Sequence, residues 1–173
     1  MENHRDRQDS DHLSEQAGRL IVKYAYSSSL TGFIPVPILD IVGLMSVQRI
    51  MLYRMSVLYS VPFKKNLAKA LLTTLTGSLA SGAAAPIAGS ALKVIPGVGA
   101  LVGGAGMATL GGASTYAIGR VFKHHFEKGG TLEDFDPKKV EDELEAEQKK
   151  ARSFRPKKSP QQNKKASARK KSS

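Results

Sequence analysis

Apolar residues recur at helical spacing along most of the chain, and no segment shows the alternation that is typical of a strand. The pattern predicts a first helix from Asp11 to about Ser28 and a second from about Ile38 to Ser60. Two prolines in the segment Ile34–Pro37 separate these helices. The second helix is apolar on nearly all sides, which is typical of a helix that is buried in protein or lipid.

Two long uncharged arms follow, because Lys93 is the only charged residue between Lys69 and Arg120. The arms are Ala70–Leu92, with 23 residues, and Val94–Gly119, with 26 residues. A helix of about 20 apolar residues is long enough to cross a bilayer. The arms therefore have the length of a helical hairpin that can enter a membrane.

A third helix is predicted from near Phe63 along the first arm, and a fourth along the second arm to about Phe126. Gly129-Gly130 ends the fourth helix, and Asp136-Pro137 begins a short helix as its N-cap and first helical residue. This short helix is polar on most of its surface, which predicts weak docking. The predicted fold class is all-α: a four-helix body with a central Gly/Ala-rich apolar hairpin, a short polar helix and a disordered basic tail.

The predicted organisation has four parts. Residues 1–10 form a disordered lead-in, and residues 11–130 form a helical membrane-associated domain that contains the apolar hairpin 70–119. Residues 131–151 form a loop and the short polar helix. Residues 152–173 form a disordered tail that is rich in Lys and Arg, a composition that cannot bury a core.

The charges around the hairpin favour membrane entry with a defined orientation. Basic residues lie before the first arm and after the second, whereas the turn between the arms offers only Lys93. The positive-inside rule then predicts a hairpin in the cytoplasmic membrane with both termini in the cytoplasm. The flanking basic residues are Lys64, Lys65, Lys69, Arg120, Lys123 and Lys128.

Small residues in the second arm are compatible with two interpretations. The spacings Gly99-x-x-x-Gly103 and Ala108-x-x-x-Gly112 allow membrane helices to approach closely. However, each glycine destabilises a helix by about 1 kcal/mol relative to alanine, and packing between other helices of a soluble protein would also support such arms. The alternative prediction is therefore a cytoplasmic all-α protein with the arms in its core.

The charge excess lies in the tail. The chain has 26 Lys and Arg against 15 Asp and Glu, a net charge of +11, and Gln148–Ser173 holds 11 of the basic residues and no acid. Such a tail is solvated, binds anionic lipid or contacts nucleic acid. Its one aromatic residue, Phe154, gives bases little to stack on, so nucleic acid is the weaker candidate. The candidate lipid contacts are Lys149, Lys150, Arg152, Arg155, Lys157 and Lys158.

The sequence predicts no enzyme, cofactor or metal site. No cysteine is present, which removes disulfides and thiolate ligands, and no P-loop motif occurs. Gly97-Val-Gly99 lacks the third glycine and the later acid of a dinucleotide-binding loop. His124 and His125 point about 100° apart on a helix, so together with Glu127 they converge poorly on one ion.

Asp40 stands in an otherwise apolar stretch, in the first turn of the second predicted helix. The favoured interpretation is that this acid complements the positive end of the helix dipole. The alternative is a buried polar contact with Gln48, Arg49 or another helix.

Several short motifs resemble the YcjF-type bacterial domain of unknown function over Ile21–Pro137. They are Ile34-Pro-x-Pro37 with Asp40, then Gln48 and Tyr59, then Ile95-Pro-Gly-x-Gly99, Ser114–Phe122 and His125-Phe-Glu-x-Gly-Gly130. Within them, the candidate family and structural residues are Pro35, Pro37, Asp40, Gln48, Pro96, Gly97, Gly99, Tyr116, Gly119, Arg120, His125, Phe126, Gly129 and Gly130. The resemblance implies a helical, membrane-associated bacterial domain, which in that family is often fused to or encoded near an Era-like GTPase.

The expected function is therefore that of a non-enzymatic membrane-associated helical protein, an anchor or effector for a GTPase-type partner. The chain carries no GTPase module of its own, so a partner would supply nucleotide chemistry. Membrane lipids, a GTPase and a second copy of the chain are the partners considered. The alternative is a soluble helical scaffold whose basic tail binds acidic partners or nucleic acid.

Overall fold

The computed structural model describes the backbone of residues 4–31, 37–84 and 98–153, and the side chains of residues 7–29, 42–79 and 111–152. Over these ranges the chain is helical and contains no strand, which confirms the all-α prediction. The helices are α1 (His4–Thr31), α2 (Pro37–Leu58), α3 (Lys65–Ala84), α4 (Val98–Glu127) and α5 (Glu141–Ser153), and a 3-10 turn, η1 (Pro137–Val140), leads into α5.

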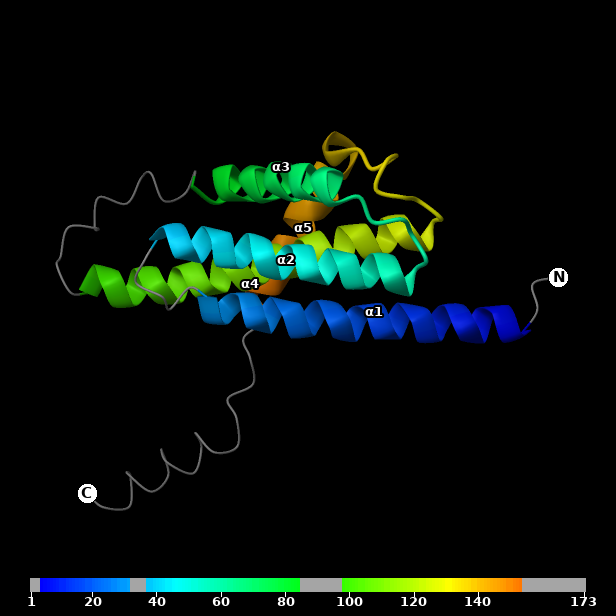
Figure 1. The fold of residues 1–173 in the computed structure, drawn as a ribbon. Coiled ribbons are helices and arrows are strands. Elements are labelled where there is room, and N and C mark those ends of the chain that lie inside the picture. The colour runs from blue at the N-terminus through cyan, green and yellow to red at the C-terminus, as the bar shows by residue number, and fades with distance from the viewer. Residues whose placement is uncertain (1–3, 32–36, 85–97, 154–173) are drawn as a thin grey trace, which may run out of the picture.

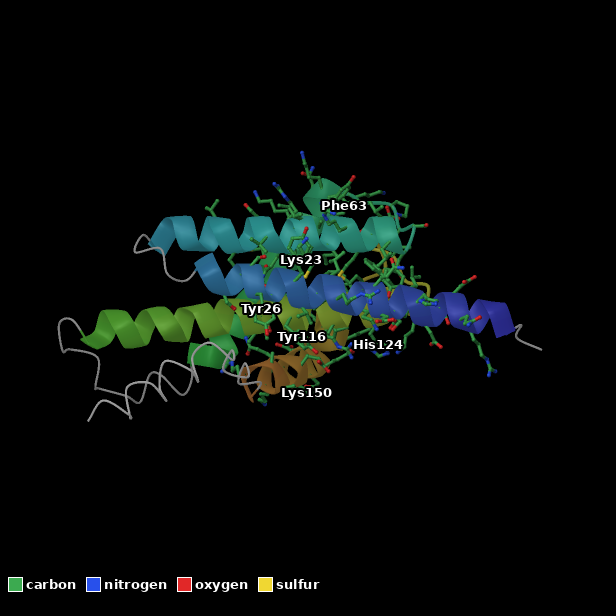
Figure 2. All side chains as sticks on the ribbon, turned by 90° about the horizontal axis from the view of Figure 1, so that it is seen from below. Lys23, Tyr26, Phe63, Tyr116, His124 and Lys150 are labelled. Carbon is green, nitrogen blue, oxygen red and sulfur yellow. The ribbon has the colours of Figure 1, made fainter. Side chains whose placement is uncertain are left out.

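The four long helices run alternately in opposite directions and form a bundle (Figure 1). The packing of α1 against α4 is the most extensive, followed by that of α5 against α4 and of α1 against α2. The short helix α5 lies on the opposite side of α4 from α2 (Figure 2). As a result, α4 is the central element, with contacts to all the other α-helices.

The core contains side chains from every α-helix. The uncharged arms contribute much of it: Leu72 and Leu75 come from the first arm, and Ala117 and Ile118 from the second, all at most 1% exposed. Burying a large aliphatic side chain stabilises a fold by about 1.5–3 kcal/mol. The described parts of both arms therefore belong to a protein core.

Some helix boundaries differ from the predicted ones. α1 begins at His4, within the segment expected to be a disordered lead-in, and not at Asp11. Its first turns are exposed and polar, and ion pairs one turn apart, such as Arg19 with Glu15 at 2.7 Å, support an exposed helix. α3 is described from Lys65 to Ala84, and the rest of the first arm lies outside the described residues.

The predicted start of the short helix is confirmed, but its weak docking is not. Asp136 is the N-cap, and its carboxylate accepts a hydrogen bond from the Lys138 amide at 3.0 Å. Leu144 is fully buried, and α5 packs against both α3 and α4. The helix is docked although most of its residues are polar.

Over the described ranges, no helix has both the length and the hydropathy that crossing a membrane requires.

Candidate functional site

A layer of hydrogen-bonded polar side chains crosses the interior of the bundle, with one residue from each long helix. Thr76 Oγ1 of α3 donates to Gln48 Oε1 of α2 at 3.0 Å, and Gln48 Nε2 donates to Thr115 Oγ1 of α4 at 3.4 Å. Thr115 Oγ1 donates in turn to Ser28 Oγ of α1 at 2.8 Å. Ser28, Gln48 and Thr115 are fully buried. We call these four residues the polar layer.

The polar layer fixes the register of the four helices. A buried donor or acceptor that loses its partner costs about 1–3 kcal/mol, so shifted arrangements of the bundle are disfavoured. The sequence motifs point to Gln48 alone. Ser28, Thr76 and Thr115 are missed because hydroxyl residues occur on exposed and buried helix faces alike. The feature of the sequence that could have identified these three residues is their position on the same helix side as the buried apolar residues.

A second polar seam joins α5 to α4. Gln148 Nε2 donates to Ser114 Oγ at 3.0 Å, and Arg152 Nη2 donates to Gln148 Oε1 at 2.7 Å. The motif residue Arg120 lies 3.6 Å from the carboxylate of Glu147, which is only 8% exposed. These buried polar contacts explain why α5 docks without a broad apolar stripe.

Three of the six candidate lipid contacts lie in this helix and already have partners within it. The contacts are Lys149–Glu145 at 3.6 Å, Lys150–Glu147 at 2.8 Å and Arg152–Gln148 at 2.7 Å. The other three residues, Arg155, Lys157 and Lys158, lie outside the described residues.

Two glycines of α4 allow it to approach α1 closely. A Cβ atom at Gly119 would lie 2.8 Å from Ile21 Cγ1 and 3.2 Å from Met51 Sδ. One at Gly112 would meet the side chain of Ser29 and lie 3.1 Å from the Ala25 carbonyl oxygen. Gly112, which belongs to the spacing expected between membrane helices, thus serves helix packing within the chain.

The motif at the end of α4 has a structural role. Gly129 has a positive φ of 80°, and the Gly130 amide donates to the His125 carbonyl at 3.0 Å. His125 Nε2 donates to the Thr131 carbonyl at 2.8 Å, and a Cβ atom at Gly130 would overlap the His125 ring. Hydrogen bonds from Thr131 lower the pKa of Asp134 in the same loop. The glycine pair therefore ends the helix, as predicted.

Four side chains form an ionic cluster where α1, α2 and α4 meet near that end. Lys123 Nζ lies 2.8 Å from Glu127 Oε1 and donates to Ser14 Oγ at 2.8 Å, and the Tyr59 hydroxyl donates to Glu127 at 3.3 Å. Burial and the Glu127 charge raise the pKa of Tyr59. Burial favours a higher pKa for Glu127, but hydrogen bonds from Lys123 and Ser14 outweigh it and lower that pKa.

The described residues contain no group of three or more side chains that could hold a metal ion. His124 Nδ1 lies 2.9 Å from Glu143 Oε1 on α5, whereas His125 points to the loop carbonyl of Thr131. The adjacent histidines therefore serve different contacts.

Six of the other motif residues fall wholly or partly outside the described part of the chain. Pro35, Pro96 and Gly97 lie outside the described residues. Pro37 and Asp40 fall in α2 and Gly99 falls in α4, but the surroundings of these residues lie outside the described part of the chain, and both interpretations of Asp40 stay predictions. Among the rest, Tyr116 packs partly buried against the core, and Phe126 is buried beside Phe122 with ring centroids 5.8 Å apart.

Charge is distributed unevenly along the bundle. Tyr24–Gln48 contains a single charged residue, Asp40, and Ala70–Gly119 contains only Lys93. The end of α1, the start of α2, the end of α3 and the start of α4 lie at the same end of the bundle (Figure 1). We call the described residues of these two stretches the charge-poor end.

Comparisons with known proteins agree on a family. The family model described as a domain of unknown function, DUF697, matches residues 4–152. Magnetosome membrane protein 22 of Magnetospirillum gryphiswaldense is 36% identical over 117 residues, which cover 67% of this chain. The aligned region spans 60% of the length of that relative. No solved structure matches the chain.

Proposed function

Because the chain belongs to the DUF697 family, as its motifs predict, we propose that it is a non-enzymatic helical module that attaches to a bacterial membrane and serves a GTPase-type partner as anchor or effector. The charge-poor end is the observation that carries the proposal. There, four helices bring together two stretches that each hold one charged residue.

Two findings support membrane attachment. A relative with 36% identity is named a magnetosome membrane protein, and the aligned region covers 67% of this chain. In addition, charged side chains are costly in the hydrocarbon of a bilayer, so an end of the bundle that nearly lacks them can approach lipid at low cost. The outer surface of the charge-poor end is the part of the molecule proposed to contact the membrane, while its inward-facing side chains stay in the core of the bundle.

The basic residues that border the charge-poor end support an orientation. The first charged residue beyond it is basic on every long helix: Lys23, Arg49, Lys69 and Arg120. Under the positive-inside rule such residues lie on the cytoplasmic side of the membrane. The proposed location is therefore the cytoplasmic membrane, with both termini in the cytoplasm. The basic tail would then lie beside anionic headgroups, each base contributing about 1 kcal/mol near the surface.

The GTPase partner is supported by the family resemblance, because domains of that family are often fused to or encoded near an Era-like GTPase. In this proposal the chain supplies position and the partner supplies nucleotide hydrolysis. A second copy of the chain is a further partner under the proposal.

Cell fractionation tests membrane attachment. Cells that express the full chain are lysed, and their membranes are washed with high salt and then with alkaline carbonate. We expect the chain to stay with membranes through the salt wash, because apolar contacts do not weaken with salt. Full release by salt, or recovery in the unwashed soluble fraction, would contradict attachment through the charge-poor end.

A binding experiment tests the partner. An Era-like GTPase from the same bacterium is loaded with GDP or with a non-hydrolysable GTP analogue and mixed with the full chain. An effector binds the GTP-loaded form more tightly, whereas an anchor binds both forms. If neither form binds, the GTPase part of the proposal fails while membrane attachment stands.

The tail supports a second candidate function, a scaffold that holds acidic partners or nucleic acid. Its support is the run of 11 basic residues without an acid in Gln148–Ser173. This function predicts nucleic-acid retention that falls steeply with salt and disappears when residues 154–173 are deleted. Retention that survives the deletion would contradict it.

A further inference from the structure

One side of α2 is unusual for a helix in a protein bundle. α2 is apolar on nearly all sides, and such helices are normally buried all round. From Val42 to Leu58, where its side chains are described, α2 has one fully buried side, with residues such as Met51, Leu52 and Met55. The other side exposes four large apolar residues, Val42 at 58%, Ile50 at 47%, Tyr53 at 51% and Val57 at 61%. We call these four residues the α2 face.

The α2 face is a narrow stripe with arginine on both borders, and Ser46, the one polar residue inside the stripe, donates its hydroxyl to the Val42 carbonyl at 2.8 Å. At about 100° per residue, Val42, Tyr53, Val57 and Ile50 lie within about 80° of one another around the helix axis. Arg49 lies about 20° beyond one border and Arg54 about 40° beyond the other. Both arginines are exposed.

The helix that carries the stripe has almost no negative charge, with one acid, Asp40, against two arginines. Between Glu15 and Glu127 the only acidic residue in the sequence is Asp40. Elsewhere, basic residues pair with acids, for example Arg19 with Glu15 and Lys123 with Glu127. The acids of α5 lie on the opposite side of α4 from α2 (Figure 2).

We propose that the α2 face lies on an anionic bilayer surface, with its apolar side chains in the headgroup region and Arg49 and Arg54 on lipid phosphates. An apolar stripe bordered by basic residues is the pattern of helices that lie in the membrane interface. Tyr53 suits that depth, because tyrosine has an apolar ring and a polar tip. Arginine binds phosphate through two parallel hydrogen bonds. The inference rests on the proposed membrane attachment and assigns to it the outer side of α2, from Val42, within the charge-poor end, to Val57, beyond it.

Charge argues for lipid over a second copy of the chain. A twofold dimer through this stripe would use the same surface of both copies. Each copy would bring Arg49 and Arg54 to the interface, whereas α2 itself holds a single acidic residue, Asp40. Like charges across an interface oppose binding, whereas anionic headgroups supply the missing negative charge.

Tryptophan fluorescence tests the inference, because the chain contains no tryptophan. Three single variants of the full chain, Tyr53→Trp, Val57→Trp and Ala146→Trp, are mixed with phosphatidylcholine vesicles that contain or lack phosphatidylglycerol. Ala146 is exposed on α5 and serves as the control. We expect a blue shift, and quenching by brominated acyl chains, for Trp at positions 53 and 57 on the anionic vesicles, and neither for Trp at position 146.

A charge variant gives a second measurement. Removing both arginines, in Arg49→Ala/Arg54→Ala, should weaken binding to the anionic vesicles at least roughly tenfold, given about 1 kcal/mol per base near such a surface. The control Lys128→Ala/Lys138→Ala removes the same charge from exposed positions away from the α2 face and should weaken binding much less.

The outcomes separate this inference from the proposed function. If the full chain binds vesicles but Trp at positions 53 and 57 gives no response, the α2 face is not the contact surface, while membrane attachment stands. An equal response at all three positions also overturns the inference. A response at position 53 only after a protein partner is added assigns the surface to that partner. If the unaltered chain binds neither vesicles nor cell membranes, both proposals fail.

Discussion

The bundle is held together differently in two regions along α4. Near the end of that helix, Phe122 stacks on Phe135 with ring centroids 4.3 Å apart, and Phe126 lies 5.8 Å from Phe122 and from Tyr59. We call these four residues the aromatic cluster. Within the charge-poor end, α4 meets α1 through Gly112 and Gly119 and is linked to all three other long helices through the polar layer.

The two regions depend on different physical effects. The aromatic cluster is stabilised by the area that it buries, which scales with the size of the side chains. The region of the glycines and the polar layer is stabilised by close fit and by satisfied hydrogen bonds, which one added methyl group or one missing amide can disrupt. The aromatic cluster should therefore be sensitive to truncation, and the other region to small additions and to loss of polarity.

Truncation of the aromatic cluster should have the largest effect. Phe122→Ala should lower the free energy of unfolding by about 3–5 kcal/mol, because Phe122 is fully buried and leaves a cavity. Chemical denaturation measures the change. Tyr26→Ala, at a site that is 60% exposed, is the control and should change stability by less than about 1 kcal/mol. If the two variants lose equal amounts of stability, the aromatic cluster does not stabilise the fold more than an exposed side chain does.

Addition of a methyl group to α4 should have the next largest effect. Gly119→Ala should destabilise the protein by about 1–3 kcal/mol, because the new Cβ would lie 2.8 Å from Ile21. Gly18→Ala, on α1, meets nothing within 4 Å and should be neutral or stabilising by up to about 1 kcal/mol. Thermal unfolding of both variants gives the comparison. A stabilised Gly119→Ala variant would show that the helices do not need this close approach.

Loss of the central amide should cost somewhat less. Gln48→Leu keeps a side chain of similar size but leaves the Thr76 hydroxyl without its acceptor, so we expect a loss of about 1–2 kcal/mol. Gln16→Leu, at an exposed position of α1, is the control for the same exchange. If Gln48→Leu is as stable as the unaltered chain, the polar layer does not set the register of the helices.

The smallest predicted effect depends on pH and concerns Glu127. Its pKa is lower in the folded chain than the usual value near 4.5, so its contribution to stability is complete above that value and is lost as pH falls through the folded pKa. Since Glu127 is partly exposed, the contribution should be below about 1 kcal/mol. Denaturation of Glu127→Gln at pH 7 and at pH 3 should show a smaller drop than the unaltered chain. An identical drop would exclude Glu127 as a source of acid sensitivity.

Much of the fold follows from the sequence, because breaks in a helical pattern are local. Pro37 begins α2, close to the predicted start of that helix, and the glycines at 129 and 130 follow the end of α4, as predicted. The family motifs also single out Gln48, which lies at the centre of the polar layer. These features depend on a few neighbouring residues or on a motif.

Other features depend on which helices meet, which one sequence does not specify. Ser28, Thr76 and Thr115 become a layer only when four helices are in register. Likewise, Glu147 and Gln148 look solvent-exposed on a polar helix, but they are buried because Arg120 and Ser114 of α4 lie opposite them. The same contacts turn a helix expected to dock weakly into a fixed part of the fold.

The polar layer also restricts where the length of the chain can change. A single residue inserted within α2 before Gln48 would rotate every earlier position by about 100° relative to the core, and a deletion would do the same in the opposite sense. Each long helix holds one residue of the polar layer. In all four helices, an inserted or deleted residue between that residue and the buried apolar residues would therefore turn the two onto different sides of the helix. Insertions and deletions should therefore accumulate in the connections at residues 59–64 and 128–136, where the register of the helices is unaffected.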